Sequence, residues 1–150
     1  MPKEFARSGM KIVYPDDWSI ETEDTEDGWT TSIYSKATAF LMLTHYPESF
    51  DPSELADMAL EATRETYPGL DSEEVIETLA SMPTVGYNVN FMALDLTNSC
   101  WIRSLAGPEG CLLLMSQCTD EEIETNGEVL RIIRESISFD DEGEAFEDDE

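Results

Sequence analysis

Short runs of apolar and β-branched residues, separated by turn residues, predict that strands make up most of this chain. Residues 10–14 form the first such run, which stops at Pro15. Residues 18–20 and 29–34 form two more, and they flank an acidic stretch that ends in Asp27-Gly28. An Asp-Gly pair between strand-like runs indicates a hairpin, because glycine readily adopts the positive φ that the turn requires.

The next run, residues 39–46, is apolar at both odd and even positions. Leu41 and Leu43 would point to one face of a sheet, and Phe40 and Met42 to the other. A strand with two apolar faces is typical of a sheet that is covered on both sides. We therefore expect this strand to be buried on both faces.

The clearest helix signals follow directly. Asp51 is suited to cap the N-terminus, Pro52 to occupy the first helical position, and Glu54 to complete a capping box. Phe50 and Leu55 stand at the positions of a hydrophobic staple, and a Pro-Gly pair is expected to end the helix. Helical spacing predicts one buried apolar face, formed by Leu55, Met58, Ala59 and Ala62.

The second half of the chain predicts further strands and a second helical region. Thr119 and Glu122 form another capping-box pattern, and Asn126-Gly127 either weakens or restarts the helix that it opens. The apolar face of that helix would hold Val129, Leu130 and Ile133, and residues 137–139 would close the fold. The expected strands are residues 74–79, 87–96, 100–106 and 111–118, with a loop at 82–84 and a hairpin turn at 107–110.

This order of elements predicts an α+β fold, an antiparallel β-sheet with helices packed on both faces as an α/β/α sandwich. The length suits a single domain, which we expect to span residues 1–139. Residues 140–150 hold eight acids and no base. A segment of that composition buries too little apolar surface to order itself, so we predict a disordered acidic C-terminal tail.

The charge of the chain restricts its partners. It has 34 acidic and eight basic residues, a formal net charge of −26, and removing the eight acids of the tail still leaves 26 against eight, or −18. Nucleic-acid affinity depends on Lys and Arg that neutralise phosphates, so we expect no nucleic-acid partner, and anionic membranes are disfavoured for the same reason. A basic protein or peptide, or a divalent cation, is compatible with this charge, and so is the plainer reading that acidity only keeps the protein soluble.

The densest acidic stretch of the predicted domain is residues 16–27, with seven acids and no base. We predict that this stretch is the contact surface for a basic partner. Its acidic residues are Asp16, Asp17, Glu21, Glu23, Asp24, Glu26 and Asp27.

No residue pattern indicates catalysis, a cofactor or a specific metal site. His45 is the only histidine, and a single histidine at the end of a strand is more often structural than catalytic. The acids from Glu23 to Gly28 imitate the start of an EF-hand loop, but its twelfth position is Tyr34 where a bidentate Glu is required. Weak divalent-cation binding stays open as an alternative.

The three cysteines show no paired spacing. If the 107–110 turn is centred on its middle residues, Cys100 lies opposite Gln117 and close to Cys118. A thiol pair or soft-metal site there is the alternative to buried thiols that act as small apolar side chains. With no signal-peptide pattern and no apolar run of about 20 residues, the sequence predicts a cytoplasmic protein.

Several short motifs stand out together: Tyr14-Pro15-Asp16-Asp17-Trp18, the helix from Asp51, Leu79 with Pro83, Gly86 and Tyr87, and the closing residues 133–139. In combination they resemble the PsbP-like superfamily, which includes PsbP, the Ran-binding Mog proteins and bacterial domains of unknown function. The resemblance covers about residues 8–139, although Ser81 stands where relatives often carry Gly, and the acidic tail is not a feature of the family. It implies an antiparallel sheet sandwiched by helices, in a family of mostly non-enzymatic binding modules, assembly factors and chaperones.

The sequence thus favours a non-enzymatic, cytoplasmic bacterial interaction domain that binds a basic protein or peptide. A specific form of this hypothesis is an assembly or export chaperone. The alternative is a small ligand- or divalent-cation-binding protein. The oligomeric state is left open by the sequence.

Overall fold

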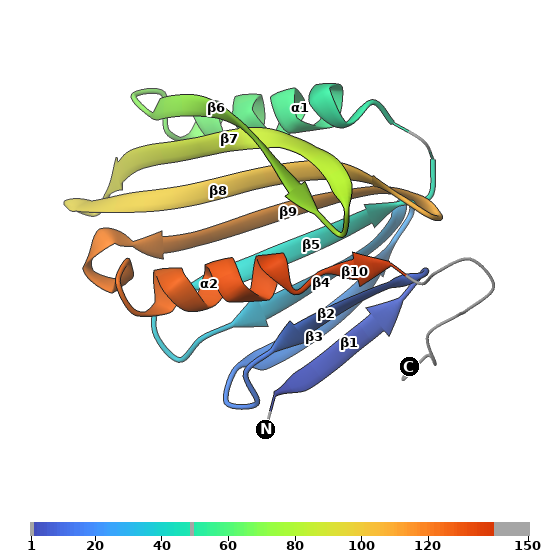
Figure 1. The fold of residues 1–150 in the computed structure, drawn as a ribbon. Coiled ribbons are helices and arrows are strands. Elements are labelled where there is room, and N and C mark those ends of the chain that lie inside the picture. The colour runs from blue at the N-terminus through green and yellow to red at the C-terminus, as the bar shows by residue number, and fades with distance from the viewer. Residues whose placement is uncertain (1, 49, 140–150) are drawn as a thin grey trace.

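The computed structural model describes residues 2–48 and 50–139, and strands dominate it (Figure 1). A short 3₁₀ helix, η1 (Asp120–Glu122), precedes the second of its two α-helices. The elements in chain order are β1 (Lys3–Arg7), β2 (Met10–Tyr14), β3 (Ser19–Thr25), β4 (Gly28–Tyr34), β5 (Phe40–Tyr46), α1 (Pro52–Thr66), β6 (Asp71–Leu79), β7 (Met82–Ala93), β8 (Leu96–Gly107), β9 (Gly110–Thr119), α2 (Asn126–Glu135) and β10 (Ser138–Phe139).

The described strands form two antiparallel sheets. The larger has seven strands in the order β3-β4-β5-β9-β8-β7-β6, and the smaller has three in the order β1-β2-β10. β5 pairs with β9 over its whole length, from Phe40 opposite Gln117 to Tyr46 opposite Cys111. This long-range pairing joins the hairpins of the first half of the chain to the meander of the second.

The acidic stretch around residues 19–25 is itself a strand. β3 and β4 form the predicted hairpin, and Glu26-Asp27 make its two-residue turn between the paired Thr25 and Gly28. Gly28 has a φ of +143°, and a Cβ there would come to 1.9 Å from the carbonyl oxygen of His45. The glycine therefore allows the hairpin to lie close to β5.

Two hairpin turns were not predicted from the sequence. Ala80-Ser81 have φ values of 54° and 63°, and Leu94-Asp95 have values of 53° and 64°. Left-handed residue pairs match the right-handed twist of the flanking strands, but they normally carry Gly or Asn, and here they do not. The predicted loop at 82–84 and the uninterrupted strand at 87–96 are therefore wrong.

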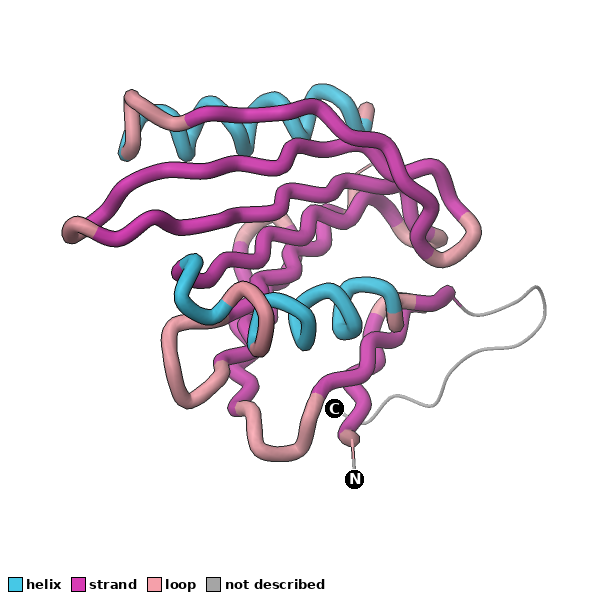
Figure 2. Tube along the Cα trace, turned by 60° about the vertical axis from the view of Figure 1, so that its left-hand side comes forward, coloured by secondary structure: helices cyan, strands magenta, loops and turns pink. Residues whose placement is uncertain are grey.

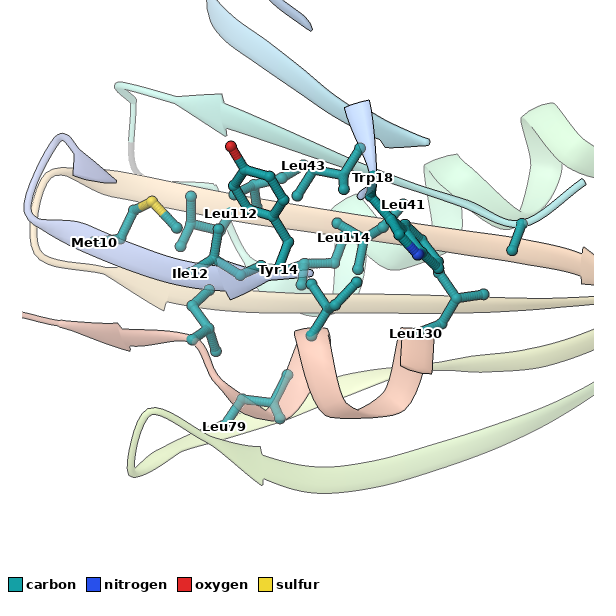
Figure 3. Close-up of a cluster of buried hydrophobic side chains, with 14 of the residues drawn as sticks. Met10, Ile12, Tyr14, Trp18, Leu41, Leu43, Leu79, Leu112, Leu114 and Leu130 are labelled. Carbon is teal, nitrogen blue, oxygen red and sulfur yellow. The ribbon is translucent and has the colours of Figure 1, made fainter. Parts of the chain in front are cut away.

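Side chains of the central strands alternate between two buried clusters. In β9, Leu112 and Leu114 enter a cluster that also holds Leu130 of α2, and Cys111 and Leu113 enter a second cluster with residues of α1. Figure 3 shows the first cluster, where side chains of β2 meet those of β5, β9 and α2. Both sides of β8 and β9 are thus packed.

The α+β class is confirmed, but the expected α/β/α sandwich is not confirmed in that form. The part of the chain that the structure describes holds two α-helices only. α1 packs on β7, β8 and β9, whereas α2 packs on β9 and on β2 of the small sheet. Figures 1 and 2 show α1 along the β6–β8 end of the large sheet, so β3, β4 and β5 extend beyond it.

Helix α1 begins as predicted but turns a different face to the sheet. The Asp51 carboxylate accepts a hydrogen bond of 2.9 Å from the Ser53 N–H, and Pro52 is the first helical residue. Met58, predicted to be buried, is 67% exposed. Ala56 and Leu60 replace Met58 and Ala62 on the buried face, which consists of Leu55, Ala56, Ala59 and Leu60.

The C-terminal region follows the prediction more closely. The helix restarts at Asn126, and Leu130 and Ile133 are buried. The Glu122 carboxylate accepts hydrogen bonds from the Thr38 N–H (3.0 Å) and from the Asn126 side chain (2.8 Å), which fixes this connection. The predicted acidic tail, residues 140–150, lies outside the described residues.

Candidate functional site

An open groove lies between α1 and the large sheet, where β5 and β9 emerge from beneath the helix. Its volume is about 550 Å³. The expectation that the strand at 39–46 is buried on both faces is wrong here: Leu41 and Leu43 are fully buried, whereas Met42 on the other face is 38% exposed. The lining residues of β5 and β9 are Met42, Thr44, Tyr46, Leu113, Met115 and Gln117, and those of α1 include Leu55, Met58 and Ala62.

Three methionines give the groove its chemical character. Met42 comes from β5, Met115 from β9 and Met58 from α1. Met42 and Met115 are direct neighbours across the β5–β9 ladder, so their side chains share one face. The thioether side chain is flexible and polarizable, which lets such a surface adapt to differently shaped apolar groups.

A second cavity of about 450 Å³ continues the groove at the N-terminal end of α1. It shares Tyr46, Leu55 and Met58 with the first cavity. The ring of Phe50 packs edge-on against Tyr46 at 5.5 Å, and Phe50 lines this cavity together with Leu55. Four carboxylates line this end, and they belong to Asp27, Glu48, Asp51 and Glu54.

The exposed edge strand β3 adds two carboxylates to the same face of the sheet. Glu21 pairs with Ser32, which pairs with Met42, and Glu23 is joined through Thr30 to Thr44 in the same way. Directly opposed residues of antiparallel strands point to the same side. Glu21 and Glu23 therefore lie on the groove side of the sheet, two strands away from the methionines.

The other acids predicted as a contact surface are distributed differently, although all seven are exposed. Asp24 points to the opposite face, where its carboxylate accepts a 2.8 Å hydrogen bond from Arg7. Asp16 lies in the turn before β3, beside an apolar cavity next to α2, and Asp17 follows it. Glu26 stands in the hairpin turn next to Asp27. Of the seven, the structure brings Asp27, Glu21 and Glu23 toward the groove.

His45 is buried on the face of β5 that points away from the groove. Its Nε2 lies 3.0 Å from the carbonyl oxygen of Glu109, and its ring stacks on Trp29 at 5.3 Å. Burial lowers the pKa of the imidazole, and the hydrogen bond to Glu109 partly offsets that shift. These contacts give His45 a packing role rather than access to a substrate.

The cysteines do not form a site with one another. Cys100 lies opposite Gln117, as the sequence predicted, but Cys118 belongs to the other buried cluster and so points to the opposite face. Burial raises the pKa of the Cys100 thiol to about 12 and, helped by Glu122, that of Cys118 to about 11. Across residues 2–48 and 50–139, all cysteines are free, and no three His, Cys, Asp or Glu side chains are grouped to hold a metal ion.

Sequence reasoning missed most of the groove. Glu48, Asp51 and Glu54 were not grouped with Asp27, because the hairpin turn and the start of α1 are about 20 residues apart in the sequence. The sequence of the helix held one usable signal. Met58 and Leu60 are two residues apart and so lie on different sides of a helix, which means that only one of them can belong to the buried face. Among the described helices, none is long and apolar enough to cross a membrane.

No family model and no curated protein matches this sequence, but solved structures match its fold. LpqN of Mycobacterium tuberculosis, described as involved in cell envelope biogenesis, is 16% identical with a TM-score of 0.56, over 92% of this chain and 88% of LpqN. The cyanobacterial PsbP (CyanoP) of Synechocystis is 7% identical with a TM-score of 0.60, over 92% of both chains. A Bacteroides thetaiotaomicron protein is 11% identical with a TM-score of 0.64, over 96% of this chain and 50% of that one.

These likenesses confirm the resemblance that the sequence motifs indicated: the chain has a PsbP-like fold. At such low identities they show the fold alone, and the fold does not fix the function. None of the three descriptions names an enzymatic activity.

Proposed function

We propose that this protein is a non-enzymatic interaction domain that binds a basic protein or peptide. One observation carries the proposal: carboxylates from separate segments line one end of an open apolar groove. Asp27 comes from the β3–β4 turn, Glu48 from the segment after β5, and Asp51 and Glu54 from the start of α1. We call these four carboxylates the acidic rim. An apolar surface with a rim of one charge sign suits a partner of the opposite sign.

The net charge adds a long-range contribution. A strongly negative protein attracts a cationic partner before contact and accelerates the encounter. The same field opposes a polyanion, which is why nucleic acid remains excluded from the proposal. At about 0.1 M salt such attraction between exposed charges is screened beyond about 10 Å, so ionic strength must influence binding.

We assign the protein to the cytoplasm of a bacterium, as an assembly or export chaperone that shields a basic segment of a client protein. The three free, buried thiols are compatible with a reducing compartment. LpqN, which shares the fold, is described as involved in cell envelope biogenesis.

A second candidate function, the binding of a small ligand, is favoured by the size of the groove. Its volume of about 550 Å³ lies in the range of small-molecule sites, and apolar groups dominate its lining. Such a ligand would carry a cationic group, which the carboxylates of the acidic rim would bind. The divalent-cation form of this alternative would use the same rim carboxylates.

Charge-neutral variants test the proposed function. We expect Asp27→Asn, Glu48→Gln and Glu54→Gln together to weaken the binding of a Lys- and Arg-rich synthetic peptide at least tenfold, because three rim charges are lost. Isothermal titration calorimetry measures the dissociation constant. The matched control is Asp71→Asn, Glu73→Gln and Glu121→Gln, which changes the net charge equally at exposed positions outside the groove. Equal weakening by both triple variants would show that net charge, and not the rim, attracts the peptide.

A further inference from the structure

We infer that the groove binds a cationic amphipathic helix, with its apolar side chains on the methionines and its Lys or Arg side chains against the acidic rim. This inference rests on the proposed function and names the site and the shape of the partner. It adds that charge alone does not suffice: the partner's apolar residues must be gathered on one face.

The first argument is the exposed apolar floor of the groove, which Met42, Met58 and Met115 form. Met58 is 67% exposed and Met42 is 38% exposed, and both line the same groove. Large apolar side chains scattered singly on a surface need no explanation, but two that face a common concave surface with Met115 do. Methionine-rich grooves accept the apolar faces of amphipathic helices in other proteins, because the thioethers repack around different side chains.

The second argument is the width of the uncovered surface. α1 packs on β7, β8 and β9, and within residues 2–48 and 50–139 no α-helix packs on the same face of β3, β4 and β5. Neighbouring strands lie about 4.8 Å apart, so these three strands span about 10 Å from first to last. A helix with its side chains is about 10 Å wide, and packed helices lie 8–10 Å apart. One further helix beside α1 therefore fits this surface.

The third argument is charge complementarity, which selects the occupant. Asp27, Glu48, Asp51 and Glu54 line one end of the groove, and Glu21 and Glu23 lie on the same face of the sheet, two strands away from β5. A second copy of this chain would bring a like-charged surface against these carboxylates, and an uncharged apolar helix would leave them without partners. A helix with Lys or Arg flanking its apolar face satisfies both the floor and the rim.

Two synthetic peptides of identical composition test the inference. Each has about 14 residues, mainly Lys and Leu; the first has Leu at helical spacing on one face, and in the second the order is permuted so that no apolar face forms. We expect the amphipathic peptide to bind at least tenfold more tightly than the permuted one. Fluorescence anisotropy of labelled peptides at about 0.15 M salt measures both dissociation constants.

Groove variants locate the binding. Met42→Ser with Met58→Ser should weaken the amphipathic peptide at least tenfold and leave the permuted peptide unchanged, because only the former uses the floor. The matched control is Met92→Ser, since Met92 is 63% exposed but does not line the groove. Thermal melts check that all variants are folded.

The possible outcomes separate the two proposals. If neither peptide binds, the proposed function is wrong as well. If both bind equally and the methionine variant has no effect, the protein binds cationic segments but the groove inference is overturned. If the variant does not fold, methyl NMR of the methionine-labelled native protein decides: shifts of Met42, Met58 and Met115 upon peptide addition support the inference, and shifts that spare them contradict it.

Discussion

At the residue scale, the least expected feature is a pair of buried arginines in a strongly acidic chain. Arg103 of β8 is 4% exposed and Arg134 of α2 is 6% exposed. Both donate hydrogen bonds to one carboxylate oxygen of Glu77 on β6, at 2.5 Å and 3.0 Å. Arg103 also donates to the Asn88 side chain at 2.9 Å. The three charged residues thus join two strands and a helix that are far apart in the sequence.

Glu77→Gln should destabilise the protein by about 3 kcal/mol, because two buried guanidinium groups lose the carboxylate that compensates them. Burial already lowers the pKa of Arg134, and Glu77 opposes that shift. Chemical denaturation measures the free energy of unfolding. Glu73→Gln on the same strand is exposed, so it should change that free energy by less than about 0.5 kcal/mol. Similar values for both variants would contradict the role assigned to Glu77.

His45 gives a prediction for the pH dependence of stability. Burial lowers its pKa in the folded state below the usual value of about 6.5. As the pH falls through that value the unfolded state takes up a proton first, so this stability is present above about pH 7 and declines as the pH falls below about 6.5. Denaturation at several pH values should show a smaller loss in His45→Gln than in the native protein over this window. Identical pH profiles would show that the imidazole is not responsible.

At the element scale, the long β7–β8 hairpin depends on a close approach at Gly86. A Cβ at this position would come to 1.8 Å from the carbonyl oxygen of Ile102 on β8. Gly86 pairs with Arg103, so a displaced strand would also disturb the buried charged residues. The resemblance drawn from the sequence already included this glycine, although the reason for it was visible only in the structure.

Gly86→Ala should destabilise the protein by several kcal/mol or prevent folding. The added methyl group would overlap the backbone of the paired strand β8, which cannot move aside as a flexible side chain could. Gly69→Ala is the matched control, since a Cβ there has no neighbour within 4 Å. Thermal melts and expression of folded protein are the measurements. A melting temperature of Gly86→Ala close to that of Gly69→Ala would show that the sheet adapts to the added methyl group.

The elements that sequence predicted well are those with local signals. The cap at Asp51 and the 107–110 turn each depend on residues that are close together in the sequence, and of the two alternatives for Asn126-Gly127 the structure shows the restart. The turns at Ala80-Ser81 and Leu94-Asp95 carry no Gly or Asn that would mark them in the sequence. The pairing of the flanking strands holds these residues in their conformation. The candidate groove was beyond reach for a related reason: its walls come from β5, β9 and α1, which only the tertiary fold brings together.

At the scale of the whole molecule, the acidic charge is organised as well as abundant. The sequence predicted one contact stretch at residues 16–27, whereas the structure divides that stretch between both faces and joins part of it to the start of α1. The proposed partner therefore meets an apolar floor and a carboxylate rim together. Attraction at a distance and burial on contact then make separate contributions, which respond differently to salt.

A salt series with the amphipathic Lys–Leu peptide measures both contributions directly. The dissociation constant should rise steeply between about 0.05 and 0.5 M sodium chloride as the rim charges are screened. A residual affinity that the Met42→Ser and Met58→Ser double variant removes should persist at the upper end, because burial of apolar surface is not screened. Two results would contradict the account of an acid-rimmed apolar groove. One is a dissociation constant that does not change with salt, and the other is a complete loss of affinity at high salt.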